Sequence, residues 1–112
     1  MPNIKNIEFS KAVNMADQVS YLDGQVVSKT LAQNKAVSVT LFAFDQGEEI
    51  STHESTGDAM VYCLDGEGEI TIGGQKSLLQ AGQCIVMPSN VPHMVYAPQK
   101  FKMMLVVIFP NT

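Results

Sequence analysis

The chain has 112 residues, of which 46% are hydrophobic and 16% charged, with a net charge of −4 and no arginine among its seven basic residues. This length and composition predict one folded domain over residues 1–112 with its own hydrophobic core. The acidic balance without a basic cluster argues against a nucleic-acid partner, and the missing arginines argue against a strongly anionic ligand.

The sequence contains no apolar stretch of signal-peptide length and none that could cross a membrane. We therefore expect a cytoplasmic protein without a membrane partner. Its two cysteines, Cys63 and Cys84, lie in apolar runs rather than in a disulfide framework. We expect both to be buried small hydrophobic residues in a reducing compartment.

The first 24 residues are predicted to form an N-terminal arm, because the sequence changes its period after Asp23-Gly24. Within this arm Ser10 is a candidate N-cap for a short helix over residues 10–19. The apolar residues of that segment recur at helical spacing; they are Ala12, Met15, Ala16 and Val19.

The rest of the sequence predicts short strands separated by turn residues. Asp65-Gly66 is expected to end one strand, and Gly73-Gly74 is a strong signal for a two-residue hairpin. Many short strands with frequent turns are typical of an all-β sandwich or barrel. The expected strands are residues 25–31, 36–44, 49–53, 59–64, 67–72, 75–80, 84–87, 93–96 and 101–109.

Three of these strands are apolar on both faces, over residues 40–44, 60–64 and 102–109. An antiparallel sheet with one face in water should alternate polar and apolar residues instead. A second copy of the chain is the expected cover, so we predict a homodimer. The alternative is that the N-terminal arm folds over this face.

Two glycine-led segments carry the only histidines of the chain, His53 and His93. On these segments the chain resembles a single-domain cupin. The first cupin motif, G-x5-H-x-H-x3-E-x6-G, is met at Gly47, His53 and Gly66. The second, G-x5-P-x-G-x2-H-x3-N, is met at Gly82, Pro88 and His93. The resemblance covers residues 37–109 and implies a double-stranded β-helix, or jelly-roll barrel, with a ligand cavity inside.

The departures from the motifs affect the metal site that the resemblance implies. Ser55 stands in place of the second histidine and Ala59 in place of the glutamate, so two of four metal-binding positions remain. Asn90 replaces a glycine, and Ala97 replaces the final asparagine. A catalytic divalent metal usually has three protein ligands. Asp58 could become the third ligand only through an irregularity in its strand.

The resemblance and strand alternation together predict a ligand pocket. Its expected lining is His53, Ser55, Ala59, Val61, Cys63 and His93. The first hypothesis is a cupin that binds a small molecule and has an incomplete metal site. The second is a metal-dependent enzyme of the dioxygenase or isomerase type, with one divalent transition metal on His53 and His93. A scaffold domain is a third reading, and the histidines could also be hydrogen-bonded pocket residues without a metal.

Overall fold

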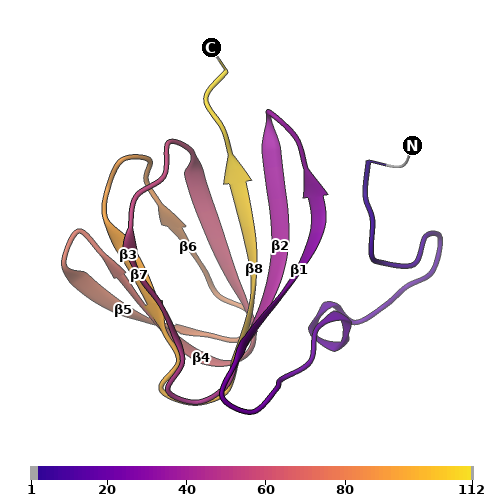
Figure 1. Cartoon of the computed structure of the whole chain (residues 1–112), viewed down its shortest axis with the longest axis horizontal. Coiled ribbons are helices and arrows are strands. Elements are labelled where there is room, and N and C mark those ends of the chain that lie inside the picture. Colours follow the sequence, from indigo (N-terminus) through magenta and orange to yellow (C-terminus); the bar gives the residue numbers. More distant parts are fainter. Residues whose placement is uncertain (1–2, 112) are drawn as a thin grey trace.

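The computed structural model describes residues 3–111 and is built almost entirely from strands (Figure 1). Among the described residues there is no helix long and apolar enough to cross a membrane. The elements are the 3₁₀ helix η1 (Met15–Gln18) and strands β1 (Val26–Gln33), β2 (Val37–Phe44), β3 (Glu49–His53), β4 (Asp58–Ile72), β5 (Gln75–Gln80), β6 (Cys84–Met87), β7 (His93–Tyr96) and β8 (Phe101–Ile108).

The strands form two antiparallel layers that share β4. The first half of β4 pairs with β8 and β6, and β8 continues through β2 to β1. The second half of β4 pairs with β5 and β7, and β7 continues to β3. We call these layers sheet A (β1-β2-β8-β4-β6) and sheet B (β3-β7-β4-β5). They converge at one end and spread at the other (Figure 1), which confirms the predicted jelly-roll barrel.

Strand β4 corrects one prediction, because Asp65-Gly66 does not end a strand. The chain bends there and continues as one strand from Asp58 to Ile72, with a shift in the β8 register between Cys63 and Asp65. Gly66 has a φ of 72°, and a Cβ at this position would lie 1.8 Å from the carbonyl oxygen of Lys100. Glycine therefore lets β4 pass from sheet A to sheet B without breaking.

The hairpin between β4 and β5 confirms the prediction made from Gly73-Gly74. Both glycines adopt left-handed conformations, with φ values of 56° and 83°. Two consecutive residues with positive φ are what a type I′ turn requires. The turn fixes the register of β5, which pairs Gln75 with Ile72.

The main core lies between the two sheets. Phe44 and Phe101 are fully buried there, with ring centroids 5.5 Å apart. Side chains from both sheets complete it, which gives the barrel a packed interior. The buried members are Phe44, Ala59, Val61, Cys63, Ile70, Leu79, Met87, Val95, Ala97, Phe101 and Met103.

A second core lies on the outer face of sheet A, under the N-terminal arm. Leu41 and Ala43 of β2 are fully buried there against arm residues that include Met15 and Val19. Two lysines of the sheet fasten the arm: Lys102 donates to the carbonyl of Ala16 (2.6 Å), and Lys29 donates to the carbonyl of Gln18 (3.0 Å). The arm therefore covers part of the face that we expected a second copy to cover.

The predicted helix over residues 10–19 is reduced to η1. Ser10 is not its N-cap, because Ser10 has a φ of 62° and the residue before η1 is Asn14. The apolar spacing still identified residues that pack against the sheet, because Met15 and Val19 both contact it. Sheet contacts hold this segment, and four residues are too few to gain much from helix propagation.

Candidate functional site

The site is built around the histidine pair, His53 and His93. His53 is the last residue of β3, and His93, the first residue of β7, lies directly opposite it in sheet B. The β3–β7 register shifts between Ile50 and His53. Asn90, in the turn before β7, has a φ of 62°, which asparagine tolerates, as its replacement of a motif glycine predicts.

The two imidazole rings meet edge to face, with centroids 4.2 Å apart and planes inclined by 71°. Their Nε2 atoms are 3.0 Å apart. The Nδ1 of His53 lies 2.8 Å from the carbonyl oxygen of Ser51, and the Nδ1 of His93 lies 3.2 Å from that of Val91. A carbonyl oxygen only accepts hydrogen bonds, so each Nδ1 is placed to donate to its carbonyl. The hydrogen bond between the two Nε2 atoms needs a proton on one of them, so one Nε2 is the donor and the other the acceptor.

The two histidines differ in their surroundings. His93 is only 4% exposed, whereas His53 is exposed to solvent. Burial, with a smaller contribution from the charge of His53, lowers the pKa of His93 below its ordinary value of 6.5. At neutral pH His93 is therefore uncharged.

Ser55 and Asp58 do not join the histidine pair. Strand β3 ends at His53, so the alternation that predicted Ser55 beside it does not extend that far, and the Ser55 hydroxyl donates to the carbonyl of Gly57 (3.1 Å). The carboxylate of Asp58 accepts a hydrogen bond from the amide of Ser89 (2.9 Å). Asp58 therefore fastens the turn after β6.

The expected lining residues Ala59, Val61 and Cys63 all belong to the main core. Their exposed fractions are 3%, 0% and 0%, and they pack in one cluster with Phe44 and Phe101. Instead of an emptied cavity, packed side chains surround Ala59. Strand alternation predicted their inward direction correctly, whereas the filling of the barrel depends on side chains from other strands.

The two cysteines have different environments. Cys63 is buried, and its thiol lies 3.6 Å from the carbonyl oxygens of Asp65 and Gly66. Burial raises the pKa of this thiol to about 11, so it is protonated at neutral pH. The prediction that Cys84 is buried is wrong: Cys84 is exposed, because it lies on the outer face of β6 opposite the outward-facing Tyr62.

A slot beside the histidine pair was missed by the sequence reasoning. In sheet B, Gln75, Ile72, His93 and His53 lie opposite one another in one row across four strands. Residues directly opposite in a sheet share a face, so the four side chains of this row lie on the same face of sheet B as the buried His93. Beside it a slot of about 340 Å³ opens between the edges of β5 and β6. Its lining is Ile72, Gln75, Ser77, Ile85, Val86 and Pro88. The sequence feature that could have indicated this slot is the presence of polar residues at alternate positions of β5, Gln75 and Ser77.

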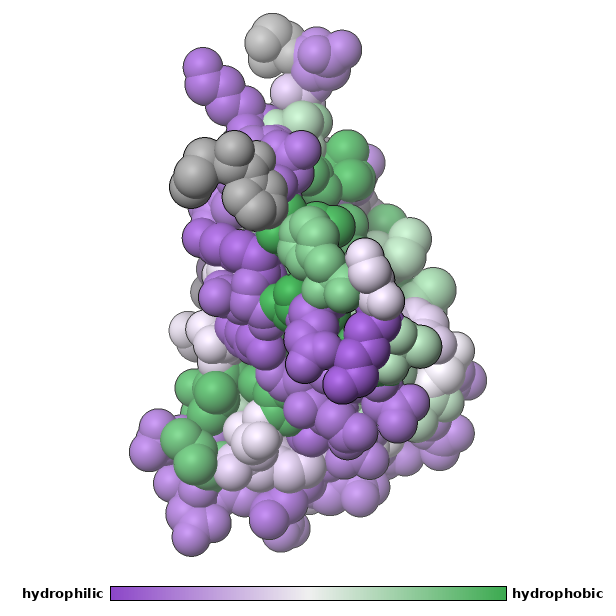
Figure 2. Space-filling view, turned by 90° about the vertical axis from the view of Figure 1, so that its right-hand side faces the viewer, coloured by the Kyte–Doolittle hydropathy of each residue, from purple (hydrophilic) through white to green (hydrophobic). Residues whose placement is uncertain are grey.

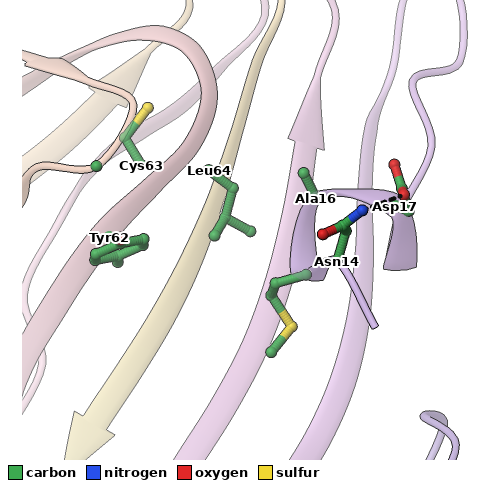
Figure 3. A pocket seen from close by; sticks show the side chains of 8 residues that line it. Asn14, Ala16, Asp17, Tyr62, Cys63 and Leu64 are labelled. Atoms are coloured by element: carbon green, nitrogen blue, oxygen red, sulfur yellow. Dashed lines mark hydrogen bonds between the residues drawn. The ribbon is translucent and has the colours of Figure 1, made fainter. Parts of the chain in front are cut away.

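A second cavity of about 440 Å³ lies between η1 and β4 (Figure 3). Asn14, Ala16 and Asp17 line it from the arm, and Tyr62 and Leu64 face them from β4. It contains neither histidine, and it marks a place where the arm covers sheet A incompletely.

The metal that the cupin resemblance implies fits these residues poorly. Two Nε2 atoms converge, but across residues 3–111 no three His, Cys, Asp or Glu side chains come together as a metal-binding group. The one conditional third ligand, Asp58, is hydrogen-bonded to Ser89 instead. Two neutral imidazoles supply neither the ligand number nor the negative charge of a usual catalytic site.

Comparison with known proteins gives a consistent picture of the family. Residues 40–109 match the family model described as "Cupin domain". A conserved protein of unknown function from Streptococcus pyogenes is 42% identical, with a TM-score of 0.96 over 100% of this chain and 98% of that one. A cupin superfamily protein from Desulfitobacterium hafniense is 29% identical, with a TM-score of 0.93 over 97% and 100% of the two chains.

A more distant solved structure is described as a predicted oxalate decarboxylase from Thermotoga maritima. It is 21% identical, with a TM-score of 0.72, and the match covers 78% of this chain and 83% of that one. At this identity the likeness concerns the fold alone. Among curated proteins none matches the chain.

Proposed function

Because the chain belongs to the cupin family, we propose that it binds a small organic molecule at the histidine pair, in a barrel whose metal site is incomplete. One observation carries this proposal: the Nε2 atoms of His53 and His93 converge to 3.0 Å while both Nδ1 atoms face backbone carbonyls. The two Nε2 atoms hydrogen-bond each other, one as donor and one as acceptor, and His53 is exposed to solvent. A ligand with a polar group can replace this bond with hydrogen bonds of its own to the two rings.

The surroundings support an organic ligand. The slot of about 340 Å³ beside the pair lies within the size range of small-molecule sites. Its wall is mainly apolar, and Ile72 joins it to His93 as the cross-strand neighbour. His93 is buried, and burial lowers its pKa, so at neutral pH it offers a bound molecule an uncharged ring.

A fragment screen by ligand-observed NMR tests this function. Fragments should bind the wild-type protein and lose binding in the His53→Ala/His93→Ala double variant. Cys84→Ser is the control, because Cys84 is exposed on the outer face of sheet A. Binding that survives the double variant, or a screen without any hit on the wild-type protein, would contradict the proposal.

A metal-dependent enzyme of the dioxygenase or isomerase type is the second candidate function. The convergence of two Nε2 atoms favours it, and the absence of a third ligand group among residues 3–111 weighs against it. Elemental analysis of untagged protein separates the two candidates. Stoichiometric Fe, Mn, Ni, Cu or Zn that disappears in His53→Ala would favour the enzyme; protein without bound metal would favour the metal-free binding site.

We also propose that the chain is a homodimer in the cytoplasm. Four residues form what we call the outer apolar patch on sheet A, and each is 37–56% exposed: Met60, Tyr62, Val86 and Ile108. Met60 lies opposite both Val86 and Val106, and Tyr62 lies opposite Met104, so the patch continues the face under the arm. The two free cysteines are compatible with a reducing compartment.

The arm also presents apolar side chains to solvent, namely Ile4, Phe9, Val13 and Leu22. Figure 2, which faces the arm, shows apolar surface running between polar regions. A two-fold contact would let the arm of one copy cover the outer apolar patch of the other, because both surfaces occur in each copy. Exposed apolar patches of this kind commonly mark interfaces.

Light scattering tests the dimer with a matched pair of variants. Val86→Glu places a charge in the outer apolar patch and should give a monomer. Leu78→Glu changes a residue of similar exposure, 56% against 51%, on strand β5 outside the patch, and should leave the dimer intact. A monomeric wild-type protein at micromolar concentration would refute the proposal.

A further inference from the structure

We propose that a second binding site lies outside the barrel, in an apolar cavity under the N-terminal arm, and that its ligand is a small uncharged hydrocarbon group of the size of a single ring. The cavity has a volume of about 250 Å³ and lies between the arm and the outer face of sheet A. Neither histidine lines it, so this inference does not depend on the proposed function.

Only apolar side chains line this cavity among residues 3–111. Ile4, Ile7 and Met15 form its wall on the arm. The facing wall belongs to β1, β2 and β8, where Ala32 and Val39 lie directly opposite each other. A polar group placed there would lose its hydrogen bonds to water without gaining a partner. Cavities with such a lining stay dry and bind apolar molecules.

Hydrogen bonds on both sides of the cavity hold the arm in place. On one side the backbone amide of Lys5 donates to the carbonyl of Leu31 over 2.8 Å. The side-chain amide of Asn6 donates to the carbonyl of Thr30, also over 2.8 Å. On the other side, two lysines of sheet A donate to carbonyls of η1. These bonds fix the distance between arm and sheet, and a ligand in the cavity does not have to displace them.

The cavity lies beside a β-bulge of β1. The β1–β2 register shifts between Thr30 and Ala32, which leaves Leu31 without a partner on β2. Leu31 is only 4% exposed, its side chain lines the cavity, and its carbonyl accepts the bond from the arm. Bulges are frequent beside functional sites, where they redirect a side chain. Here the bulge supplies both a wall of the cavity and an anchor for the arm.

The size of the cavity suits one ring. An apolar cavity of about 150 Å³ is sufficient for benzene, so about 250 Å³ accommodates a ring with a small substituent. The arm covers the cavity with the partly buried Ile7 and Met15, and Ile4, which is 50% exposed, forms its edge. A free molecule therefore enters more readily than a side chain that is tethered to a second copy.

Toluene and phenol, two rings of similar size, test the ligand class. Titrations use protein labelled with ¹³C at the methionine methyl groups. Met103 and Met104 are neighbours on β8 and report on different sites, because Met103 packs in the main core and Met104 lines the cavity. Toluene should shift the signals of Met15 and Met104 and leave that of Met103 unchanged. It should bind at least about tenfold more tightly than phenol, whose hydroxyl finds no partner there.

Two variants test the position of the site. Ala32→Phe fills the cavity from the sheet, Ile7→Trp fills it from the arm, and each should weaken toluene binding at least about tenfold. Ala81→Phe is the matched control, because it adds a ring to the exposed turn between β5 and β6 and should leave binding unchanged. Urea unfolding shows whether each variant is folded. If Ala32→Phe is not, Ile7→Trp decides, because Ile7 lies outside the sheet.

The remaining outcomes would overturn the inference. Unchanged Met15 and Met104 signals with toluene at its solubility limit, or phenol binding as tight as that of toluene, would contradict the ligand class. Met104 signals that respond to protein concentration but not to toluene would assign the cavity to a side chain of a second copy. A shift confined to Met60 would place toluene on the outer apolar patch instead. The toluene shifts should survive in His53→Ala/His93→Ala, so the fragment screen decides the proposed function separately.

Discussion

Gly66 is the position at which the bend of β4 can be tested against a matched control. A Cβ at Gly66 would lie 1.8 Å from the Lys100 carbonyl oxygen, and the residue has a φ of 72°. Gly74, in the β4–β5 hairpin, has a similar φ of 83°, but a Cβ there would meet nothing within 4 Å. Alanine therefore imposes similar conformational strain at both positions. Only at Gly66 does its Cβ also clash with the backbone.

The expected magnitudes follow from this difference. Left-handed strain costs about 1–2 kcal/mol for an L-residue, so Gly74→Ala should lower the free energy of unfolding by about that amount. Gly66→Ala adds a displacement of the Lys100 backbone beside Phe101, which is fully buried. We expect a total near 4 kcal/mol or more, at the upper end of single substitutions. Domains of this kind are stable by only about 5–15 kcal/mol, so this variant should be close to unfolding.

Urea unfolding followed by circular dichroism measures both free energies. The midpoint should fall moderately for Gly74→Ala and severely for Gly66→Ala. Equal losses of stability in the two variants would refute the reasoning, because they would show that the contact with Lys100 does not constrain the bend.

Three further predictions concern the residues around the site. Burial, and to a smaller extent the charge of His53, lowers the pKa of His93 in the folded state, so the unfolded chain binds this proton more readily below its own pKa of about 6.5. The free energy of unfolding should therefore be highest above that pH and fall as the pH drops below it. Urea midpoints measured at pH 7 and pH 5 should differ less in His93→Gln than in the wild-type protein. Asp58→Ala should cost about 1 kcal/mol by removing the acceptor for the Ser89 amide and leave fragment binding unchanged, which urea unfolding and the NMR screen measure; lost binding would instead make Asp58 a ligand-contacting residue. A thiol reagent should modify one cysteine, the exposed Cys84, in native protein and both in denaturant, and fast native reaction of Cys63 would contradict its burial and raised pKa.

The sequence was sufficient for most of the strand positions, because alternation and turn glycines are local signals. The bend at Gly66 was not predictable in this way, because the local sequence around a glycine that ends a strand does not differ from that around a glycine that bends one. The close approach of Lys100, a residue far along the chain, makes the difference. Coverage of sheet A by the arm likewise depends on contacts between distant segments.

The histidine pair could be anticipated from motif spacing, but its chemistry could not. Spacing placed His53 and His93 together, whereas the direction of each ring depends on the carbonyls of Ser51 and Val91. Ser55 was predicted by extending an alternation past the end of β3. The position of Gln75 in one row with the histidines follows only from the pairing of β5 with β4 and of β4 with β7, which sequence patterns do not give.

The most direct test of the central claim is a titration of the wild-type protein with a fragment from the screen, followed by the ring signals of His53 and His93 in ¹H–¹⁵N NMR. If the ligand binds at the histidine pair, the ring signals of both histidines should shift together until the site is saturated. Binding that leaves both sets of ring signals unchanged would contradict this claim.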